Sequence, residues 1–500
     1  MSAFIGIDLG TTFSAVATLD QSGRPVIIHN EDGENITPSC VAESSPGSFF
    51  VGEEARRTWG IAPAEAAARF KRDMGSSVTH KINNHNFTPT ELSALVLKKL
   101  RTIAENSKGI IGEAVITIPA NFSNEAREAT MAAAKSVGLN VNYIINEPTA
   151  AALYYAFDNG QDLNGTYAIY DLGGGTFDVS IIRVSGQDID VIASNGVSKL
   201  GGDDFDEAIK RIVSRKYHDL TGDTLEEDDY TSNDAEDDKK SLSRRQEVKA
   251  RANRKLVSVS RLEFENEISG LVTQAEMLCE ATLDEADVEP EDIKAVFLAG
   301  GSTRIPIILE SIKRVFEQEP VASANVDEVV AQGAALYAAY KGDKSNLSQA
   351  QKNSIEKINV SETTNKCFGT LIFTYDEERG QEKTVNTTLI EKGDQIPCSV
   401  TKTFFTVVDN QTSVNCELTE TTSPETDPKF AKVIWNGELS LPSGRPAGQE
   451  IKVTYSYDEN QMMKCSFVDV GTGRKTEVDM SFSNSKNDTE VLDINNFLVE

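Results

Sequence analysis

The chain has 500 residues and a formal net charge of −29, because 78 acidic side chains outnumber 49 basic ones. This charge disfavours nucleic acid and anionic membrane surfaces as main partners, since contacts to phosphate groups need clustered Lys and Arg. Hydrophobic residues make up 39% and charged residues 25% of the sequence, which is typical of a folded globular protein rather than a disordered one.

Three further features of the sequence bear on its compartment. No apolar run approaches the ~20 residues that a membrane helix needs. The first residues lack the basic segment and cleavage site of a secretory signal. The six cysteines form no CxxC pair, as expected for free thiols in a reducing compartment. We therefore expect a cytoplasmic protein that has neither a membrane nor a nucleic acid as its partner.

Up to residue 343, short β-rich runs alternate with helical patterns, which predicts an α/β domain with mixed sheets. The clearest strands, and then the clearest helices, are expected at residues 3–7, 14–19 and 114–118, and at residues 89–106 and 124–137. Residues 344–361 are mostly polar and short of aromatic residues, as a linker would be.

After about residue 360 the helical period disappears, and β-rich runs follow one another between turn signals. Strands are expected at residues 387–390, 403–408, 413–418, 450–457, 462–468 and 475–482. Regular strands without helices predict an antiparallel β-sandwich over residues 362–483. In the tail, residues 484–500, the helical spacing of Val491, Ile494 and Leu498 predicts one or two amphipathic turns.

An acidic run is followed directly by a basic run within the first half. Ten of the twenty residues at 219–238 are acidic, and eight of the residues at 239–255 are basic. Such runs usually form a solvated helical face or a surface loop. The alternative is a segment that responds to a bound ligand.

An internal repeat predicts a site for phosphate. Residues 4–13 and 167–178 each contain an apolar strand that ends in Asp-Leu-Gly and continues with small and hydroxyl residues. A tight glycine turn lets backbone N–H groups approach phosphate oxygens, and Asp8 and Asp171 could hold a hydrated Mg²⁺ ion. One such turn is usually an ordinary hairpin. Two related copies favour a duplicated fold that clamps nucleotide phosphates between two lobes.

A third glycine turn, Gly300-Gly301-Ser302, follows an apolar strand and precedes a helical pattern. Backbone amides at a helix start favour an anion or permit close approach of an adenosine, although a purely structural turn is equally compatible. The sequence lacks the P-loop pattern GxxxxGK[ST] and the GxGxxG fingerprint, and it also lacks HExxH and GxSxG. These absences disfavour the corresponding nucleotide folds, metalloproteases and serine hydrolases.

The combined motifs resemble those of the seventy-kilodalton heat-shock (DnaK-type) chaperone family, within the actin and sugar-kinase ATPase superfamily. The resemblance rests on Gly6-Ile-Asp-Leu-Gly-Thr-Thr12, Ile145-Asn-Glu-Pro-Thr-Ala-Ala-Ala152, Asp171-Leu-Gly-Gly-Gly-Thr-Phe-Asp178, Leu200-Gly-Gly-Asp-Asp-Phe-Asp206 and Gly300-Gly-Ser-Thr-Arg304. It implies a two-lobed, actin-like ATPase domain at residues 1–343, with ATP or ADP and Mg²⁺ as cofactors, and a peptide-binding β-domain after it.

The resemblance also implies roles for individual residues. Lys71 would orient the attacking water and stabilise charge on the γ-phosphate, together with Glu147, Asp171 and Thr176. A hydrated metal ion would be held by Asp8, Asp171 and Asp178. The nucleotide would contact Gly10, Thr11, Thr12, Phe13, Gly173, Gly174, Gly175, Gly202, Glu236, Lys239, Lys240, Ser243, Gly300, Gly301, Ser302, Arg304 and Asp327.

Further implications concern coupling. Pro119 and Arg127 match the family's relay between the lobes. Lys240 stands where many relatives have Arg, which removes a planar stacking group. If Glu236, Lys239 and Ser243 contact adenosine from one helical face, ATP should order residues 236–255 by bridging them to the third glycine turn.

In the β-domain, the resemblance places Phe404, Val407, Val414 and Cys416 in a groove that takes an extended apolar peptide through strand-like hydrogen bonds. A core position is equally compatible with each of them, because inward strand positions are apolar in any sandwich. The implied partners are unfolded or extended peptide clients, a J-domain co-chaperone and a nucleotide-exchange factor.

Two departures from the family pattern shape the predicted function. The linker carries Ile355, Ile358 and Val360 instead of a leucine-rich run, and the sequence ends about 17 residues after residue 483, which leaves no room for the family's helical lid. We therefore expect a lidless, slowly ATP-hydrolysing chaperone. The alternatives are an ATP-binding scaffold or co-chaperone with little hydrolysis and, less favoured, a small-molecule kinase.

Overall fold

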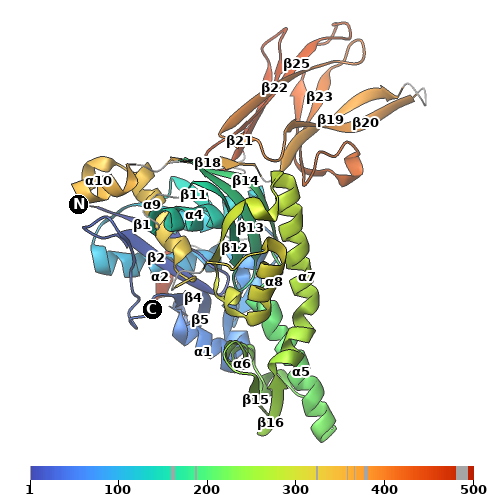
Figure 1. Cartoon of the computed structure of the whole chain (residues 1–500). Helices are drawn as coiled ribbons and strands as arrows, with labels where there is room; N and C mark the ends of the chain where they lie inside the picture. The colour runs from blue at the N-terminus through green and yellow to red at the C-terminus, as the bar shows by residue number, and fades with distance from the viewer. Residues whose placement is uncertain are drawn as a thin grey trace. The chain divides into compact units, whose positions relative to one another are not determined.

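The computed structural model describes residues 2–158, 164–185, 188–321, 325–356, 359–364, 366–376, 381–479 and 494–500. The chain forms two compact units (Figure 1), one of Met1–Val360 with Glu490–Glu500 and one of Ser361–Thr489. In the part of the chain that is described, no helix has the length and apolar character needed to cross a bilayer.

The first lobe of the first unit is built on a mixed sheet with the order β11-β10-β1-β2-β3. β1 pairs antiparallel with β2 and parallel with β10, and β4 pairs with the start of β2. The strands are β1 (Ala3–Asp8), β2 (Phe13–Leu19), β3 (Pro25–Ile27), β4 (Thr37–Pro38), β10 (Ile111–Ile118) and β11 (Tyr143–Asn146). The three strands expected in this region are confirmed within one to three residues.

The second lobe repeats this arrangement, as the internal repeat predicts. β12 pairs antiparallel with β13 and parallel with β17, and β14 pairs antiparallel with β13. In both lobes, Asp-Leu-Gly therefore lies at the end of the first strand of a hairpin. That strand, β1 or β12, also pairs with a parallel strand on its other side. The strands are β12 (Gly165–Leu172), β13 (Phe177–Ser185), β14 (Asp188–Val197) and β17 (Ile293–Ala299).

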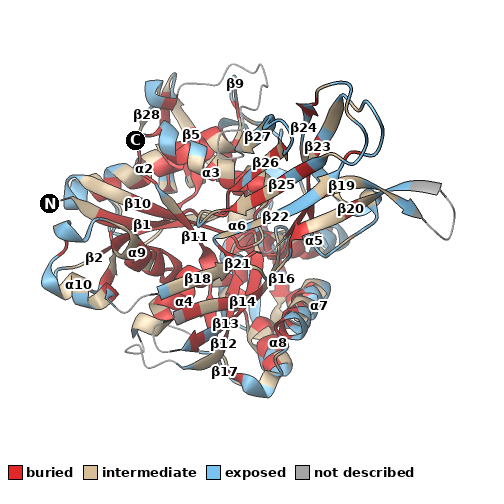
Figure 2. Cartoon of the chain, turned by 90° about the horizontal axis from the view of Figure 1, so that it is seen from above, coloured by how far each residue is buried: buried red, intermediate tan, exposed pale blue. Residues whose placement is uncertain are grey.

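Two apolar helices, α4 (Glu147–Asp158) and α9 (Val329–Lys341), pack against each other between the two sheets. α9 lies on β1, β2 and β10, whereas α4 lies on β12, β13, β14 and β17. A Cβ atom on Gly333 would lie 1.7 Å from the carbonyl oxygen of Ala150, so the close approach of the two helices requires glycine there. Figure 2 shows that buried residues are concentrated in these helices and in the sheets.

The remaining helices cover the outer faces. Thr88 and Glu91 form a capping box that starts α2, which explains why the predicted helix begins at Pro89. The helices are α1 (Glu53–Ile61), α2 (Pro89–Lys108), α3 (Asn124–Ser136), α5 (Gly202–Thr221), α6 (Ser232–Leu242), α7 (Arg261–Ala286) and α8 (Pro306–Phe316). Short strands accompany them: β5 (Cys40–Ser45), β6 (Ser48–Val51), β7 (Ala66–Ala68), β8 (His80–Ile82), β9 (His85–Phe87), β15 (Glu247–Ala252) and β16 (Lys255–Ser260).

The segment expected to be a linker over residues 344–361 is largely folded, so that prediction needs correction. A capping box at Ser348 starts α10 (Gln349–Ile355), and the Gln351 side chain donates hydrogen bonds to the carbonyl oxygens of Leu19 and Asp20. Ile355 is buried in the core of the first unit. Ile358 lies outside the described residues. Polar composition alone could not reveal a short capped helix that uses one apolar side chain as its anchor.

The second unit contains two antiparallel four-stranded sheets, β20-β19-β23-β24 and β22-β25-β26-β27, whose buried residues form one cluster. The predicted strand at residues 403–408 is shorter at its end, because β22 stops at Phe405. The strands are β18 (Asn359–Thr363), β19 (Cys367–Asp376), β20 (Gln381–Ile390), β21 (Gln395–Ile396), β22 (Cys398–Phe405), β23 (Ser413–Thr421), β24 (Lys432–Ser440), β25 (Glu450–Tyr457), β26 (Met463–Asp469) and β27 (Lys475–Asp479).

The last described residues contain one of the one or two amphipathic turns suggested by their spacing, but Leu498 does not continue it. Ile494–Asn496 is a single 3₁₀ turn, and Leu498–Val499 is a strand, β28, that pairs in parallel with β6. Backbone hydrogen bonding to an open sheet edge outweighs the helical spacing of two apolar residues. Val491 and residues 480–483 lie outside the described residues.

Candidate nucleotide site

Three aspartates of the repeat lie close to the strand ends of the two lobes. Asp8 ends β1, and its Oδ1 accepts a hydrogen bond of 2.9 Å from Thr117 Oγ1 on β10. Asp171 of β12 lies opposite Asp178 of β13 in the antiparallel register. The duplicated strand-turn-strand pattern therefore brings carboxylates from both lobes to one place.

Lys71 and Glu147 form a buried ion pair beside these aspartates. The Lys71 Nζ atom lies 2.7 Å from Glu147 Oε1, and the two residues are only 5% and 7% exposed. Lys71 comes from a 3₁₀ turn, Phe70–Asp73, while Glu147 is the first residue of α4. The ring of Phe122 lies on the other side of the ammonium group, with its centroid 5.6 Å from Nζ. These contacts hold the lysine in one position.

Burial and like charge raise the pKa values of the aspartates. Burial, reinforced by Glu147, raises the pKa of Asp8 to about 7, although Lys71 and the hydrogen bond from Thr117 act in the opposite direction. The pKa values of Asp171 and Asp178 are also raised, first by burial and then by the negative charge of Glu147. A single lysine does not compensate this much negative charge, so the cluster fits an additional cation.

The residues present fit a nucleotide phosphate with a hydrated Mg²⁺ ion. Thr12 Oγ1 and Asp178 Oδ1 are buried and have no hydrogen-bond partner among the described residues. A Cβ atom on Gly174 would lie 1.8 Å from Thr12 Oγ1, so glycine lets the two turns meet. The unpartnered Asp178 oxygen can accept a hydrogen bond from a water ligand of such an ion.

The glycine turn that follows Asp171, here called the second phosphate turn (residues 172–176), is hydrogen-bonded to the start of α5 and to the third glycine turn. The backbone N–H of Gly202 donates to the carbonyl oxygen of Gly173 at 3.0 Å, and Ser302 Oγ donates to the same oxygen at 2.8 Å. Within the turn, the Gly173 N–H donates to the Thr176 carbonyl oxygen at 3.2 Å. Gly175 packs against Thr11, where a Cβ atom would approach Thr11 Cγ2 to 2.5 Å. Three predicted glycine segments are therefore adjacent.

The glycine turn that follows Asp8, here called the first phosphate turn (residues 9–12), is held by hydrogen bonds in a similar way. Its Gly10 N–H donates to Ser14 Oγ at 3.1 Å, and Ser39 Oγ donates to the Gly10 carbonyl oxygen at 2.8 Å. The backbone N–H of Ser39 also donates to the Thr12 carbonyl oxygen. These hydrogen bonds hold the turn in its conformation.

The residues predicted to contact adenosine come from α6 and the third glycine turn. Lys239 Nζ donates to the Gly202 carbonyl oxygen at 2.8 Å and lies 2.7 Å from Asp206 Oδ1. Ser243 caps the C-terminal end of α6. At the third glycine turn, Gly300 has a φ of 80° and Arg304 Nη2 lies 3.0 Å from Asp327 Oδ2.

Glu236 connects α6 to the first lobe. Its Oε2 lies 2.8 Å from Arg56 Nη2 on α1, and its Oε1 lies 2.7 Å from Lys240 Nζ. Burial opposes ionisation, but these two cations together lower the pKa of Glu236 to about 2. The Lys240 ammonium group also lies 5.2 Å from the centroid of the ring of Phe13, the first residue of β2.

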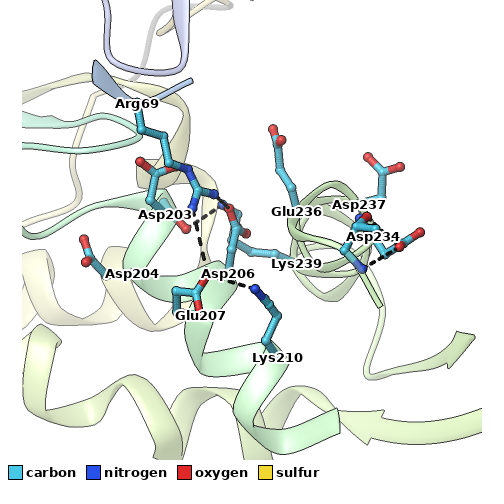
Figure 3. Close-up of polar contacts among 12 residues, drawn as sticks. Arg69, Asp203, Asp204, Asp206, Glu207, Lys210, Asp234, Glu236, Asp237 and Lys239 are labelled. Atoms are coloured by element: carbon cyan, nitrogen blue, oxygen red, sulfur yellow. Dashed lines mark hydrogen bonds and ion pairs between the residues drawn. The ribbon is translucent and has the colours of Figure 1, made fainter. Parts of the chain in front are cut away.

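Sequence reasoning missed a second set of contacts between the lobes. Arg69 Nε lies 2.9 Å from Asp203 Oδ1, and Arg72 Nη2 lies 2.6 Å from Asp204 Oδ2. Figure 3 shows Arg69 reaching the carboxylates at the start of α5. The sequence did contain a signal for these contacts, because two basic residues lie close to Lys71 and two acidic residues directly follow Gly202. Only the fold shows that these oppositely charged segments face each other.

The predicted relay residues, Pro119 and Arg127, flank the segment that contains Phe122, whose ring contacts Lys71. Pro119 follows β10 directly, and Arg127 on α3 is 1% exposed. The Arg127 guanidinium donates to the carbonyl oxygens of Phe122 and Ala120 at 3.1 and 3.2 Å. Arg127 therefore holds the segment whose Phe122 ring contacts Lys71, which connects α3 to the candidate catalytic lysine.

The four predicted peptide-contact residues have different environments in the second unit. Val407 is 57% exposed in the segment after β22, while Phe404 and Val414 are half-buried against the core. Cys416 is fully buried in that core, and burial raises its pKa to about 12. Its side chain therefore occupies the core position that the sequence left as the alternative. Two exposed apolar neighbours, Phe405 and Val408, were not predicted.

A comparison with known protein families matches residues 4–496 to the Hsp70 protein family. The matched span includes most of both units, and the mixed α/β architecture of the first unit is consistent with an actin-like ATPase fold. With this match added to the phosphate turns, the buried lysine and the carboxylate cluster, the chain belongs to the Hsp70 family, whose members are ATPase chaperones that bind ATP or ADP with Mg²⁺.

Proposed function

We propose that this protein is a chaperone that hydrolyses ATP slowly in its first unit and binds extended apolar peptides with its second unit. The observation that carries the proposal is the buried Lys71–Glu147 ion pair, held 2.7 Å apart beside three aspartates of raised pKa. A fixed ammonium group in a buried site is suited to stabilising negative charge that develops on a phosphoryl group.

Each part of the site has a distinct task in this proposal. The backbone N–H groups of the two phosphate turns, with Thr11 and Thr12, bind the phosphates. Asp8, Asp171 and Asp178 would hold a hydrated Mg²⁺ ion, which would supply positive charge for the phosphate group. Lys71, oriented by Glu147, positions the attacking water and stabilises the transition state, while Thr176 lines the γ-phosphate position.

Asp171 belongs to the catalytic set through its charge. Catalysis in such sites depends mostly on positioning and electrostatic stabilisation, so a strong base is not required. Burial and the negative charge of Glu147 raise the pKa of Asp171, whereas a cation beside it would favour its ionised form. We therefore assign Asp171 to holding the hydrated ion beside the γ-phosphate.

The proposed peptide site lies around the segment that joins β22 to β23. β22 is the outer strand of its sheet, so its edge can add an extended peptide through backbone hydrogen bonds. Val407 and the exposed side chains of Phe405 and Val408 would contact apolar residues of that peptide. Phe404 and Val414 would form the floor. Peptide clients, a J-domain co-chaperone and a nucleotide-exchange factor are the proposed partners.

One observation favours the alternative of an ATP-binding scaffold with little hydrolysis. The segment that follows α9 is packed on the first unit as α10, with Ile355 buried. A connecting segment held in this way has less freedom to report peptide binding to the ATP site. In that case ATP would bind normally but peptide would not change turnover.

ATP turnover with and without an apolar peptide tests the proposal. The parent protein should hydrolyse ATP slowly and faster with peptide. Lys71→Ala should lower turnover by roughly 100-fold or more while ATP binding is nearly unchanged, because the lysine acts mainly in the transition state. The exposed Lys81→Ala is the matched control and should behave as the parent. Equal turnover in Lys71→Ala and the parent would refute the catalytic assignment, and turnover insensitive to peptide would favour the scaffold.

A further inference from the structure

The chain returns to its first unit after completing the second. Residues 490–500 belong to the same compact unit as residues 1–360. There, β28 adds to β6 as a parallel strand, with Leu498 opposite Ser48 and Val499 opposite Phe49. Figure 2 shows β28 beside α2 and β5 at the C-terminal end of the described chain.

Backbone hydrogen bonds hold this strand along its length. The Leu498 N–H donates to the Gly47 carbonyl oxygen at 3.0 Å, and the Glu500 N–H donates to the Phe49 carbonyl oxygen at 2.9 Å. In return, the Val51 N–H donates to the Glu500 carbonyl oxygen at 3.2 Å. The edge of β6 is thereby covered by a segment that lies about 450 positions later in the sequence.

Side chains of the added segment alternate between the core and the solvent. Ile494 is 4% exposed within the core of the first lobe, and Phe497 and Val499 pack against the same core. The Phe497 ring lies 5.1 Å from the ring of Phe49 in an edge-on arrangement. It also contacts the rings of Phe87 and His85, at 5.9 and 6.3 Å. Leu498 points away and is 68% exposed, as the alternation of a strand requires.

Polar contacts fix the register of the segment. Lys98 Nζ on α2 donates to the carbonyl oxygens of Phe497 and Ile494, at 2.7 and 3.4 Å. Ser48 Oγ donates to Glu500 Oε1 at 2.7 Å. The lysine thus binds the carbonyl groups of the 3₁₀ turn, and the serine binds the carboxylate at the far end. Apolar, backbone and charged contacts all select this one segment.

We propose that residues 494–500 are a releasable strap, and that the edge of β6, with Phe49, His85, Phe87 and Lys98, is its docking site. The segment follows Ser361–Thr489 in the sequence, yet it belongs to the same compact unit as Met1–Val360.

The strap can be released because it is short and lies at the protein surface. Segments that make few backbone hydrogen bonds open far more readily than the strands of a central sheet. The segment nevertheless stays bound most of the time. Because it is part of the same chain, its effective concentration at the docking site is in the millimolar range. The proposal does not depend on ATP hydrolysis, because it follows from contacts outside the nucleotide site.

A labelled peptide with the sequence of residues 494–500 tests the proposal on the full-length chain. In Ile494→Ser/Phe497→Ser the tethered segment loses its two anchoring side chains. The peptide should therefore bind this variant roughly 100-fold more tightly than it binds the parent, in which the tethered strap occupies the site. Leu498→Ser is the matched control, because its side chain is exposed, and it should resemble the parent.

Hydrogen exchange provides an independent measurement. The amides of Val51 and Glu500 should be protected in the parent and exchange at least tenfold faster in the double variant. Because Ile494 is a core residue, Lys98→Met provides a second variant that spares the apolar contacts; it should speed exchange of the same amides. Equal peptide binding by parent and variant would overturn the docking site. Unchanged exchange in both variants would overturn the strap.

Discussion

Removing the charge of Glu236 tests whether the contact between α1 and α6 stabilises the first unit. The substitution Glu236→Gln keeps the size of the side chain and an acceptor oxygen for Arg56 but removes the attraction to two cations. Arg56 is 17% exposed and Lys240 is 55% exposed at the side chain, so water can solvate both after the change. The substitution should therefore reduce stability without leaving a buried charge unpaired.

The pKa of Glu236 gives the magnitude. Its value falls from 4.5 to about 2, and one pKa unit corresponds to about 1.4 kcal/mol, so the ionised form is stabilised by on the order of 3 kcal/mol. Because glutamine retains a weaker hydrogen bond to Arg56, we expect a loss of about 2 kcal/mol at pH 7. The folded pKa lies below the unfolded one, so this stabilisation is present above about pH 4.5 and is lost as the pH falls toward 2.

Urea denaturation followed by tryptophan fluorescence measures the stability of the first unit, which contains Glu236. The chain has two tryptophans, and Trp59 lies on α1 beside Arg56, so a Trp435→Phe background reports the first unit alone. Asp237→Asn is the matched control, because its side chain is 75% exposed and its nearest contact to Arg56 is 4.0 Å. Identical midpoints for Glu236→Gln and the parent at pH 7, or a difference that does not narrow below pH 4.5, would refute the reasoning.

The remaining predictions concern the nucleotide site. Asp8→Asn combined with Asp171→Asn should weaken Mg²⁺-dependent ATP binding at least tenfold, measured by calorimetry with and without the metal; equal metal dependence in variant and parent would contradict the shared metal site. Gly174→Ala should reduce ATP affinity at least tenfold, because its Cβ atom would lie 1.8 Å from Thr12 Oγ1; unchanged affinity would show that the turns need not meet. ATP should slow hydrogen exchange over residues 236–255, and equal protection with and without ATP would mean that this segment does not respond to the nucleotide.

Local chemistry by itself predicted the repeated strand and glycine turn of the two lobes. Asp8 and Asp171 were proposed as metal-holding residues because each directly precedes a Leu-Gly turn at the end of an apolar strand, and both signals depend only on neighbouring residues. The start of α2 was equally predictable, since Thr88, Pro89 and Glu91 carry a complete capping signal. The role of Lys71 came from resemblance, because a lone lysine has no local signature of catalysis.

Only the tertiary structure decided which distant segments meet. Arg56 pairs with Glu236 across 180 positions, and nothing in either local sequence specifies the partner. α10 formed where polar composition predicted a linker, and β28 formed where apolar spacing predicted the end of one or two amphipathic turns. Each of these short segments has only a weak intrinsic preference for helix or strand. Its conformation is set by the surface that it packs on, because contacts to α9 or to the open edge of β6 outweigh local propensity.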